Sequence, residues 1–304
     1  MDAYDGFYAS QITVDGCDGS HWIISGPGRP DDAGVTLSPE LTGAIDAPVK
    51  TQWLPGAFGE EPQGFRWQRR DMVFAVQTFA DDHETWMTVD SNWRAAWDYV
   101  KPTKITYTTS AGSRWVWARM LEEPKSYEGQ ITRGKSPFLT CDATVVMTVA
   151  SSLPFYEGET QVFEWELPEG QTWANLQIEI NNDSDVPVFP RWTLTDQAIW
   201  TLPDFSWGSE EYSRGLQDAG RMVELPELRE NENVVVDADP RLQTIISANM
   251  ANVQSRWRGQ DLLYPIAPGV SSSMPVTVRE ATNGAALRLE LKRWFTRPWG
   301  RPLP

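Results

Sequence analysis

Short strand-like segments dominate the second half of the chain, and this pattern constrains the fold more than any other feature. Apolar or alternating segments follow one another at residues 163–167, 175–181, 188–195, 198–202, 220–225, 233–239, 242–247, 274–281 and 285–295. Stretches rich in Asn, Asp, Pro and Gly separate them. Many short strands with regular turns are typical of an antiparallel sandwich or barrel. We therefore expect an antiparallel β-sandwich over residues 156–304, with its last two strands forming a hairpin across Thr282, Asn283 and Gly284.

The first half combines strands with long polar stretches. Residues 70–79 and 141–152 are strand-like, and 104–121 has the pattern of a hairpin with a turn at 110–113. Residues 25–34 and 54–64 are dense in Gly, Pro and acidic side chains, which indicates long exposed loops or arms.

One helix is expected between these strands. Five apolar residues recur at spacings that place them on one helical face: Trp86, Val89, Trp93, Trp97 and Val100. Lys101-Pro102 should stop the helix, because a residue before proline avoids the α region. A tryptophan stripe at this spacing indicates core packing rather than a cofactor site. We expect the helix to cover one face of the first sheet.

These elements predict a mainly β protein with two domains. The Pro- and Gly-containing stretch at 151–161 is the expected boundary. It separates an α+β domain with one amphipathic helix, residues 1–155, from the β-sandwich, residues 156–304. No internal repeat or low-complexity tract modifies this division.

Charge is distributed unevenly. The chain carries a formal net charge of −16, which argues against non-specific nucleic-acid binding. The stretch 285–304 is nevertheless basic, with one acid, Glu290, and five cations: Arg288, Lys292, Arg293, Arg297 and Arg301. Two readings stay open: docking onto an acidic surface, such as that of a second copy, or a solvated terminus.

The sequence lacks the features of a membrane or secreted protein. The chain has no apolar run long enough to span a membrane and does not begin like a signal peptide. We expect a soluble protein made in the cytoplasm, without membrane insertion. Cys17 and Cys141 should be separate reduced thiols in that setting.

No catalytic constellation is evident. His21 and His83 lie outside any zinc-binding motif, and both are expected to be exposed. Asp237 and Asp239 end a run of β-branched residues before Pro240. They could hold a metal such as calcium, but a strand-end turn is favoured because Asp before Pro starts turns readily. We predict no catalytic, cofactor-binding or metal-binding residues, and no enzymatic activity.

Several segments together resemble a known family. They are residues 66–79, 111–124, 144–158, 233–244, 268–270 and 291–302, in this order and spacing. The pattern is similar to the distal tail proteins (Dit) of long-tailed bacteriophages, especially the minor tail proteins of phages that infect actinobacteria such as mycobacteria. The acidic stretches within residues 25–64 match least well.

The resemblance implies a structural protein of the virion. It implies an N-terminal belt domain, of which six copies close into a ring, followed by a galectin-like sandwich. Such a ring lies at the tail tip, is assembled in the host cytoplasm, joins the tail tube to the tip and host-recognition proteins, and lets DNA pass. No catalytic residues belong to this role.

Two other functions remain open from the sequence. The sandwich could be a carbohydrate-binding module, since it is rich in tryptophan and Trp207 is expected to be exposed. A glycoside hydrolase would need two acids facing each other in a cleft, and sequence alone does not show such a separation.

Overall fold

The computed structural model describes residues 10–126, 136–282 and 284–300, and it divides the chain into two compact units. Among the described residues, the first unit comprises 10–126, 136–158 and 295–300, and the second comprises 159–282 and 284–294. The sequence predicts a single boundary at residue 155, whereas residues 295–300 return to the first unit after the second unit. The start of the chain, which bore on the signal-peptide prediction, lies outside the described residues, as do Asn283 and Arg301.

The first unit is built on one antiparallel sheet. Along the sheet the strands follow the order β2-β1-β7-β8-β9-β6-β3, and the short strand β10 pairs with both β8 and β20. The strands are β1 (Ser10–Asp15), β2 (His21–Ser25), β3 (Gly34–Thr42), β6 (Arg70–Phe79), β7 (Thr103–Thr109), β8 (Gly112–Met120), β9 (Asp142–Ser151), β10 (Tyr156–Glu157) and β20 (Trp294–Phe295). A single turn of helix, α3 (Pro137–Thr140), precedes β9.

Alternation along these strands creates the core of the first unit. Ile105 and Tyr107 on β7 are buried, and they pack with Val116 and Phe74 in one apolar cluster. The predicted hairpin of β7 and β8 is confirmed, with Thr109 paired to Gly112. The face that carries Trp115 and Trp117 is the more exposed face of β8.

The predicted helix is α1 (His83–Ala95), which packs on the sheet. Asp82 caps its start by accepting hydrogen bonds from the backbone N–H groups of Glu84 (2.9 Å) and Thr85 (3.0 Å). The buried Trp93 contacts Trp22 edge to face at 5.6 Å. The helical face therefore packs against the first sheet, as the tryptophan spacing predicted.

The helix ends earlier than the Lys101-Pro102 stop suggested. Ala96 is its C-cap, and the Asp98 carboxylate accepts hydrogen bonds from the N–H groups of Val100 (2.6 Å) and Lys101 (2.8 Å). This Asx turn redirects the chain, because a short polar side chain competes with the helix for backbone donors. Trp97 still reaches the core from the turn, whereas Val100 is exposed.

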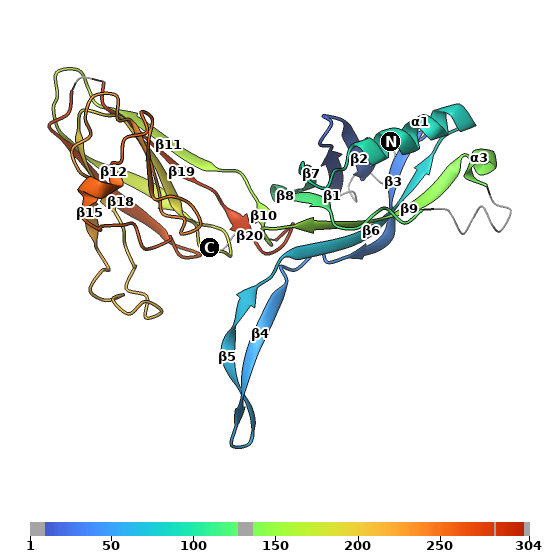
Figure 1. Cartoon of the computed structure of the whole chain (residues 1–304), viewed down its shortest axis with the longest axis horizontal. Coiled ribbons are helices and arrows are strands. Elements are labelled where there is room, and N and C mark those ends of the chain that lie inside the picture. The colour runs from blue at the N-terminus through green and yellow to red at the C-terminus, as the bar shows by residue number, and fades with distance from the viewer. Residues whose placement is uncertain (1–9, 127–135, 283, 301–304) are drawn as a thin grey trace. The chain divides into compact units, whose positions relative to one another are not determined.

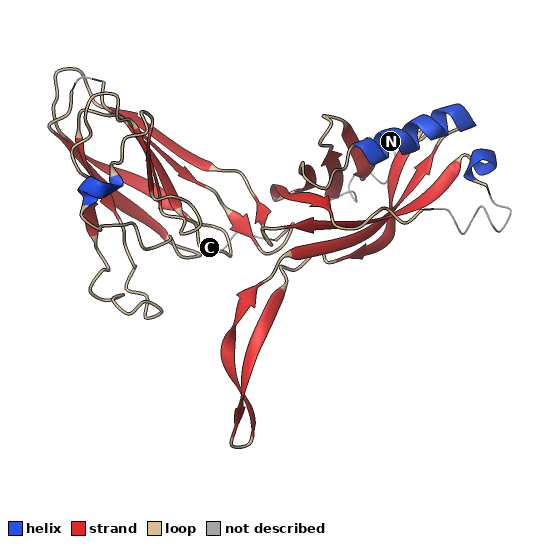
Figure 2. Cartoon of the chain, viewed as in Figure 1, coloured by secondary structure: helices blue, strands red, loops and turns tan. Residues whose placement is uncertain are grey.

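The second unit consists of two antiparallel sheets (Figure 2). One sheet has the order β11-β19-β13-β16-β17, and the other has the order β12-β18-β14-β15. The strands are β11 (Gln161–Glu166), β12 (Ala174–Asn181), β13 (Pro190–Leu194), β14 (Ile199–Pro203), β15 (Met222–Glu224), β16 (Val234–Asp237), β17 (Ile245–Ser247), β18 (Ser271–Arg279) and β19 (Ala286–Leu291). A short 3₁₀ helix, η1 (Gln254–Trp257), lies between β17 and β18. The predicted antiparallel sandwich is confirmed.

Both sheets contribute buried side chains to one core. Trp192 on β13 and Trp200 on β14 are fully buried, and Leu289 on β19 and Val276 on β18 join the same cluster. The predicted hairpin across residues 282–284 was wrong. β18 pairs with β12 and β14, whereas β19 pairs with β11 and β13, so this connection crosses from one sheet to the other.

The basic stretch 285–304 is neither a free docking tail nor a frayed end over its described part. Arg288 pairs with Glu164 (2.7 Å), and Arg293 pairs with Asp183 (2.9 Å). Arg297 pairs with Asp46. Much of the local positive charge is therefore compensated by acids of the same chain.

Candidate functional site

An isolated hairpin leaves the first unit between β3 and β6 (Figure 1). Its strands are β4 (Val49–Gly56) and β5 (Gly59–Trp67), which pair with each other and with no other described strand. The turn lies at Ala57 and Phe58, and Gly59 takes the positive φ of 100° that the tight turn requires. We call this hairpin the arm. The sequence predicted a loop or arm over 54–64 but not its strands, because Gly, Pro and acids are poor strand formers.

The two faces of the arm differ in chemistry. Val49 pairs with Trp67, Thr51 with Phe65, and Trp53 with Pro62, so these six side chains share one face: an apolar face with a single hydroxyl. The opposite face carries mainly polar groups, including Lys50, Gln52 and Arg66. A register shift between Gln52 and Trp53 is a bulge that keeps the large side chains on the same side.

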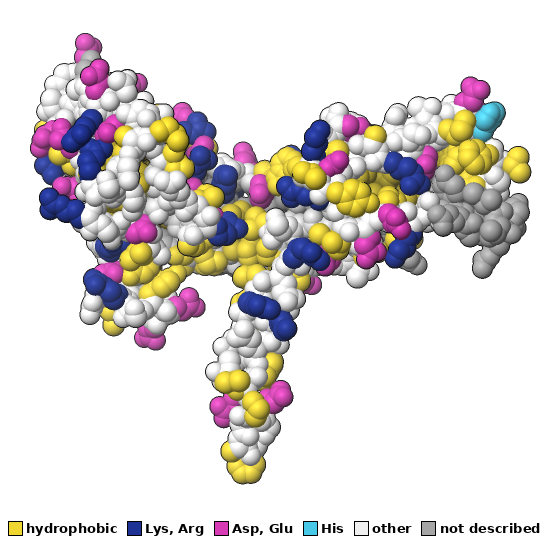
Figure 3. All heavy atoms as spheres, in the orientation of Figure 1, with side chains coloured by type: hydrophobic (Ala, Val, Ile, Leu, Met, Phe, Trp, Pro, Cys, Tyr) yellow, Lys and Arg dark blue, Asp and Glu magenta, His cyan; other side chains and the backbone are white. Residues whose placement is uncertain are grey.

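The apolar face of the arm is open to solvent, and Figure 3 shows apolar side chains exposed along the arm and at its tip, among polar ones. Trp53 is 50% exposed and Phe65 57% exposed, and Phe58 at the tip is fully exposed. Burying a large apolar side chain contributes about 1.5–3 kcal/mol. A two-stranded ribbon is also marginally stable on its own in water. A long exposed ribbon with one apolar face is therefore typical of a segment that is covered in an assembly.

The base of the arm is fixed to its own unit. Trp67 contacts Phe155 edge to face at 5.0 Å, and Phe65 contacts Trp67 at 5.2 Å. The N–H of Gln68 donates to the carbonyl of Pro48 at 2.9 Å. These contacts set the direction in which the arm leaves the sheet, so its apolar face is presented in a defined orientation.

Asp237 and Asp239 form the strand-end turn that was favoured from the sequence. The Asp237 carboxylate accepts a hydrogen bond from the N–H of Asp239 at 2.9 Å, and Asp239 holds Arg241 with contacts of 2.6 and 2.9 Å. Burial raises the pKa of Asp237. Burial opposes ionisation of Asp239 as well, but its hydrogen bonds from Arg241 outweigh this effect and lower its pKa. Both carboxylates already have partners within the chain.

The histidines and cysteines take the places predicted for them. His21 is exposed on β2, with its Nδ1 2.6 Å from the Asp15 carboxylate, and His83 is the exposed first residue of α1. Cys17 and Cys141 are free thiols.

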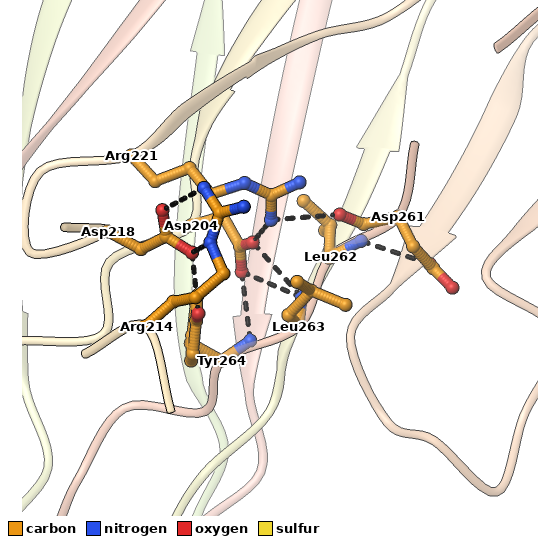
Figure 4. Close-up of polar contacts among 8 residues, drawn as sticks. All are labelled: Asp204, Arg214, Asp218, Arg221, Asp261, Leu262, Leu263 and Tyr264. Carbon is orange, nitrogen blue, oxygen red and sulfur yellow. Dashed lines mark hydrogen bonds and ion pairs between the residues drawn. The ribbon is translucent and has the colours of Figure 1, made fainter. Parts of the chain in front are cut away.

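A buried polar cluster in the second unit brings acidic, basic and tyrosine side chains together (Figure 4). Asp204 forms an ion pair with Arg221 and accepts hydrogen bonds from the N–H groups of Leu263 and Tyr264, both at 3.0 Å. Asp218 accepts from the Tyr264 hydroxyl at 2.7 Å. These contacts tie the turn-rich loop 204–221 to the segment 261–264.

The electrostatics of this cluster favour a structural role. Burial raises the pKa of Asp204, whereas the hydrogen bond from Tyr264 lowers that of Asp218 and raises that of the tyrosine. The Asp204 side chain is only 1% exposed. A glycosidase acid must reach substrate in a cleft, and this carboxylate is enclosed by its own donors.

The features that would suit carbohydrate are weak. Trp207 is half-buried, packs against the sandwich core and contacts Phe205 at 5.3 Å, so the expectation of an exposed ring was wrong. A shallow groove of about 610 Å³ lies along β11, β13 and β19. Trp165, which lines it, also packs against the core.

Two further kinds of site, a metal cluster and a membrane-spanning helix, are absent from the described part of the chain. No three His, Cys, Asp or Glu side chains gather there as a metal would require. None of the helices described is both long and apolar enough to cross a membrane.

The fold of the chain is that of a phage Dit protein. The crystal structure of the Dit protein (gp 19.1) of phage SPP1, described as a hub of the adsorption apparatus in phages infecting Gram-positive bacteria, matches with a TM-score of 0.56 at 10% identity, covering 94% of this chain and 99% of that one. A chain of the phage p2 baseplate in its activated conformation with Ca matches with a TM-score of 0.50 at 9% identity, covering 93% and 98%.

Sequence comparison is more specific. The chain is 27% identical to minor tail protein Gp27 of Mycobacterium phage D29 and 26% identical to Gp27 of Mycobacterium phage L5, in each case over 88% of this chain and 93% of the relative. No family profile matches the chain. The predicted resemblance is confirmed, because the chain is similar in sequence to phage minor tail proteins and similar in fold to a Dit protein.

Proposed function

We propose that the chain is a distal tail hub whose copies, six in number, close into a ring at the end of the tail tube. The first unit would form the ring, as the belt domain of residues 1–155 was predicted to do. The second unit, expected to be galectin-like, would face the tail-tip and host-recognition proteins. DNA would pass through the opening of the ring, and the protein would act as a scaffold rather than as a catalyst.

The exposed apolar face of the arm carries this proposal. Trp53, Phe58 and Phe65 are too large and too exposed to be left in water by a stable monomer. A neighbouring copy is the partner that satisfies every arm at once, because a heterologous contact whose rotation closes produces a ring without free ends. Contact with a neighbour would also support the isolated ribbon.

The overall charge supports the passage of DNA. The chain has a formal net charge of −16, and six copies would multiply this value. A strongly negative ring repels phosphate, so the nucleic acid would cross without adhering. The tail tube protein on one side and the tip proteins on the other are the remaining proposed partners.

Native mass spectrometry of the purified protein tests the proposal. We expect a dominant species of six copies that survives dilution and moderate salt, since an apolar contact is little screened. A strict monomer at high protein concentration would contradict ring formation by the chain alone.

The rival functions have separate tests. Titration with purified host cell-wall glycans would show a saturable shift if the sandwich bound carbohydrate, and replacing Trp207 would abolish that shift. Release of sugar from purified cell wall would indicate a glycoside hydrolase. The enclosure of Asp204 and the half-buried state of Trp207 favour neither function.

A further inference from the structure

The first unit is discontinuous in sequence. Its sheet is formed by residues up to Gly158, yet the segment 295–300 returns to it after the whole of the second unit. We call residues 295–300 the strap. The strap begins in β20, which pairs with β10 at the end of the first stretch.

A fully buried arginine depends on the strap. Arg70, the first residue of β6, has an exposed fraction of 0%. Its guanidinium donates to three carbonyl oxygens: those of Pro154 at 2.8 Å, Gly43 at 2.9 Å and Thr296 at 3.0 Å. It also stacks on the Tyr156 ring at 4.7 Å. One of the three acceptors therefore comes from the strap.

A second arginine is bound even more closely by the strap. Arg114 on β8 donates to the carbonyls of Arg297 at 3.0 Å and Gly300 at 3.1 Å. Its guanidinium lies 3.6 Å from the centroid of the Phe295 ring. The arginine is 9% exposed, so without the strap its charge would lose these partners in a poorly hydrated position.

Apolar packing joins the strap to the core of the first unit. Phe295 is buried and belongs to the same cluster as Tyr156 and Val116. Its ring approaches the backbone so closely that a Cβ at residue 158 would lie 2.6 Å from it, which explains glycine at that position. Trp299 adds a contact with Tyr107 at 6.3 Å.

We infer that docking of the strap completes the first unit and acts as an assembly checkpoint. A chain is synthesised from its N-terminus, and domains usually fold in that order. Here the first unit is left with two incompletely satisfied arginines and an open core until residues 159–300 have been made. Buried charges that lack partners are strongly destabilising. Only chains that contain an intact second unit and strap would then enter the ring, a last step that rests on the proposed function.

Amide hydrogen exchange of a chain ending at Trp294 tests the inference. We expect the amides of β6 and β9 to exchange at least ~100-fold faster than in the complete protein. Those of β13 and β18 should change less than about threefold, because the second unit has a core of its own. Adding a synthetic peptide of residues 295–300 should restore slow exchange in β6 and β9. A change below ~10-fold in those strands would overturn the inference.

Point variants of the complete protein guard against poor solubility of the shortened chain. Arg114→Met and Phe295→Ser should each accelerate exchange in β6 and β9 by ~10-fold or more, and Arg279→Met, at an exposed ion pair with Glu224 in the second unit, should not. If the amides of β6 and β9 exchanged at the same rate in all three variants, the proposed role of the strap would be refuted. The readout concerns a single copy, so it stands apart from ring formation: a monomeric protein with a strap-dependent first unit would refute the ring and uphold the strap.

Discussion

Replacing Trp53 and Phe65 together by serine is expected to convert the assembled protein into monomers. Both side chains lie on the apolar face of the arm, and they are 50% and 57% exposed. Aromatic side chains at the centre of an interface cost 2 kcal/mol or more each when truncated. Loss of roughly 4 kcal/mol per contact weakens each interface by about 1,000-fold. In a ring, every copy contributes one such contact, so the loss recurs at each interface.

The matched control is a variant that changes the polar face of the arm. Lys50→Ser with Gln52→Ser changes two exposed polar residues of β4 without removing an apolar side chain. We expect this variant to assemble like the unaltered protein. The first unit should stay folded in both variants, because the substituted side chains are exposed and lie outside its core. Assembly of the Trp53 and Phe65 variant, measured by native mass spectrometry, would show that the apolar face is not the contact.

Replacing Arg221 by alanine is expected to destabilise the second unit by about 3 kcal/mol at neutral pH, since breaking one side of a buried ion pair leaves an unpaired charge. Its partner Asp204 is almost completely enclosed. Arg221 also donates to the carbonyl of Asp261 at 3.1 Å, so one of the contacts between the loop 204–221 and the segment 261–264 would be lost as well. Chemical denaturation of the second unit measures the effect.

The loss of stability in the Arg221→Ala variant should become larger as pH rises. Burial raises the pKa of Asp204 in the folded protein above its unfolded value, and removing Arg221 should raise it further. Between the unfolded and folded pKa values the native state binds more protons, so stability falls as pH rises. The loss in free energy of unfolding caused by Arg221→Ala should therefore be smallest at acidic pH, where Asp204 is protonated. It should be largest above the pKa of Asp204 in the folded protein. Arg279→Ala, which removes exposed pairs, should cost less than about 1 kcal/mol with little pH dependence. A deficit independent of pH would contradict this account.

Much of the regular structure followed from local patterns. The alternation in residues 70–79 and 104–121 identified β6 and the hairpin of β7 and β8, because a half-buried strand repeats every two residues. The tryptophan spacing located α1, although Asp98 ended the buried face by a turn rather than by further helix. Period and turn chemistry are local properties, so a single sequence reveals them.

The sequence was less informative about which strands pair with each other. β18 and β19 have the alternation expected of a hairpin, yet each pairs within a different sheet. Alternation says which side chains face a core but not which strand lies alongside. The same limit applies to the basic stretch, where Arg293 and Arg297 find acids at positions 183 and 46, far away in the sequence.

The candidate site was the hardest part to predict. The arm contains Gly, Pro and acids, which suggest a loop, and its apolar face depends on cross-strand pairs such as Thr51 with Phe65. A usable signal was present in the alternation from Val49 to Trp53, followed by a glycine-flanked turn. The roles of Arg70 and Arg114 depend on the return of the strap, which no local pattern indicates.

Cryo-electron microscopy of the isolated assembly tests the central claim most directly, because it reveals both the copy number and the position of every arm. We expect a closed ring of six copies in which the face bearing Trp53 and Phe65 is covered by the adjacent copy. Particles of one copy, or a ring whose arms extend freely into solvent, would contradict it.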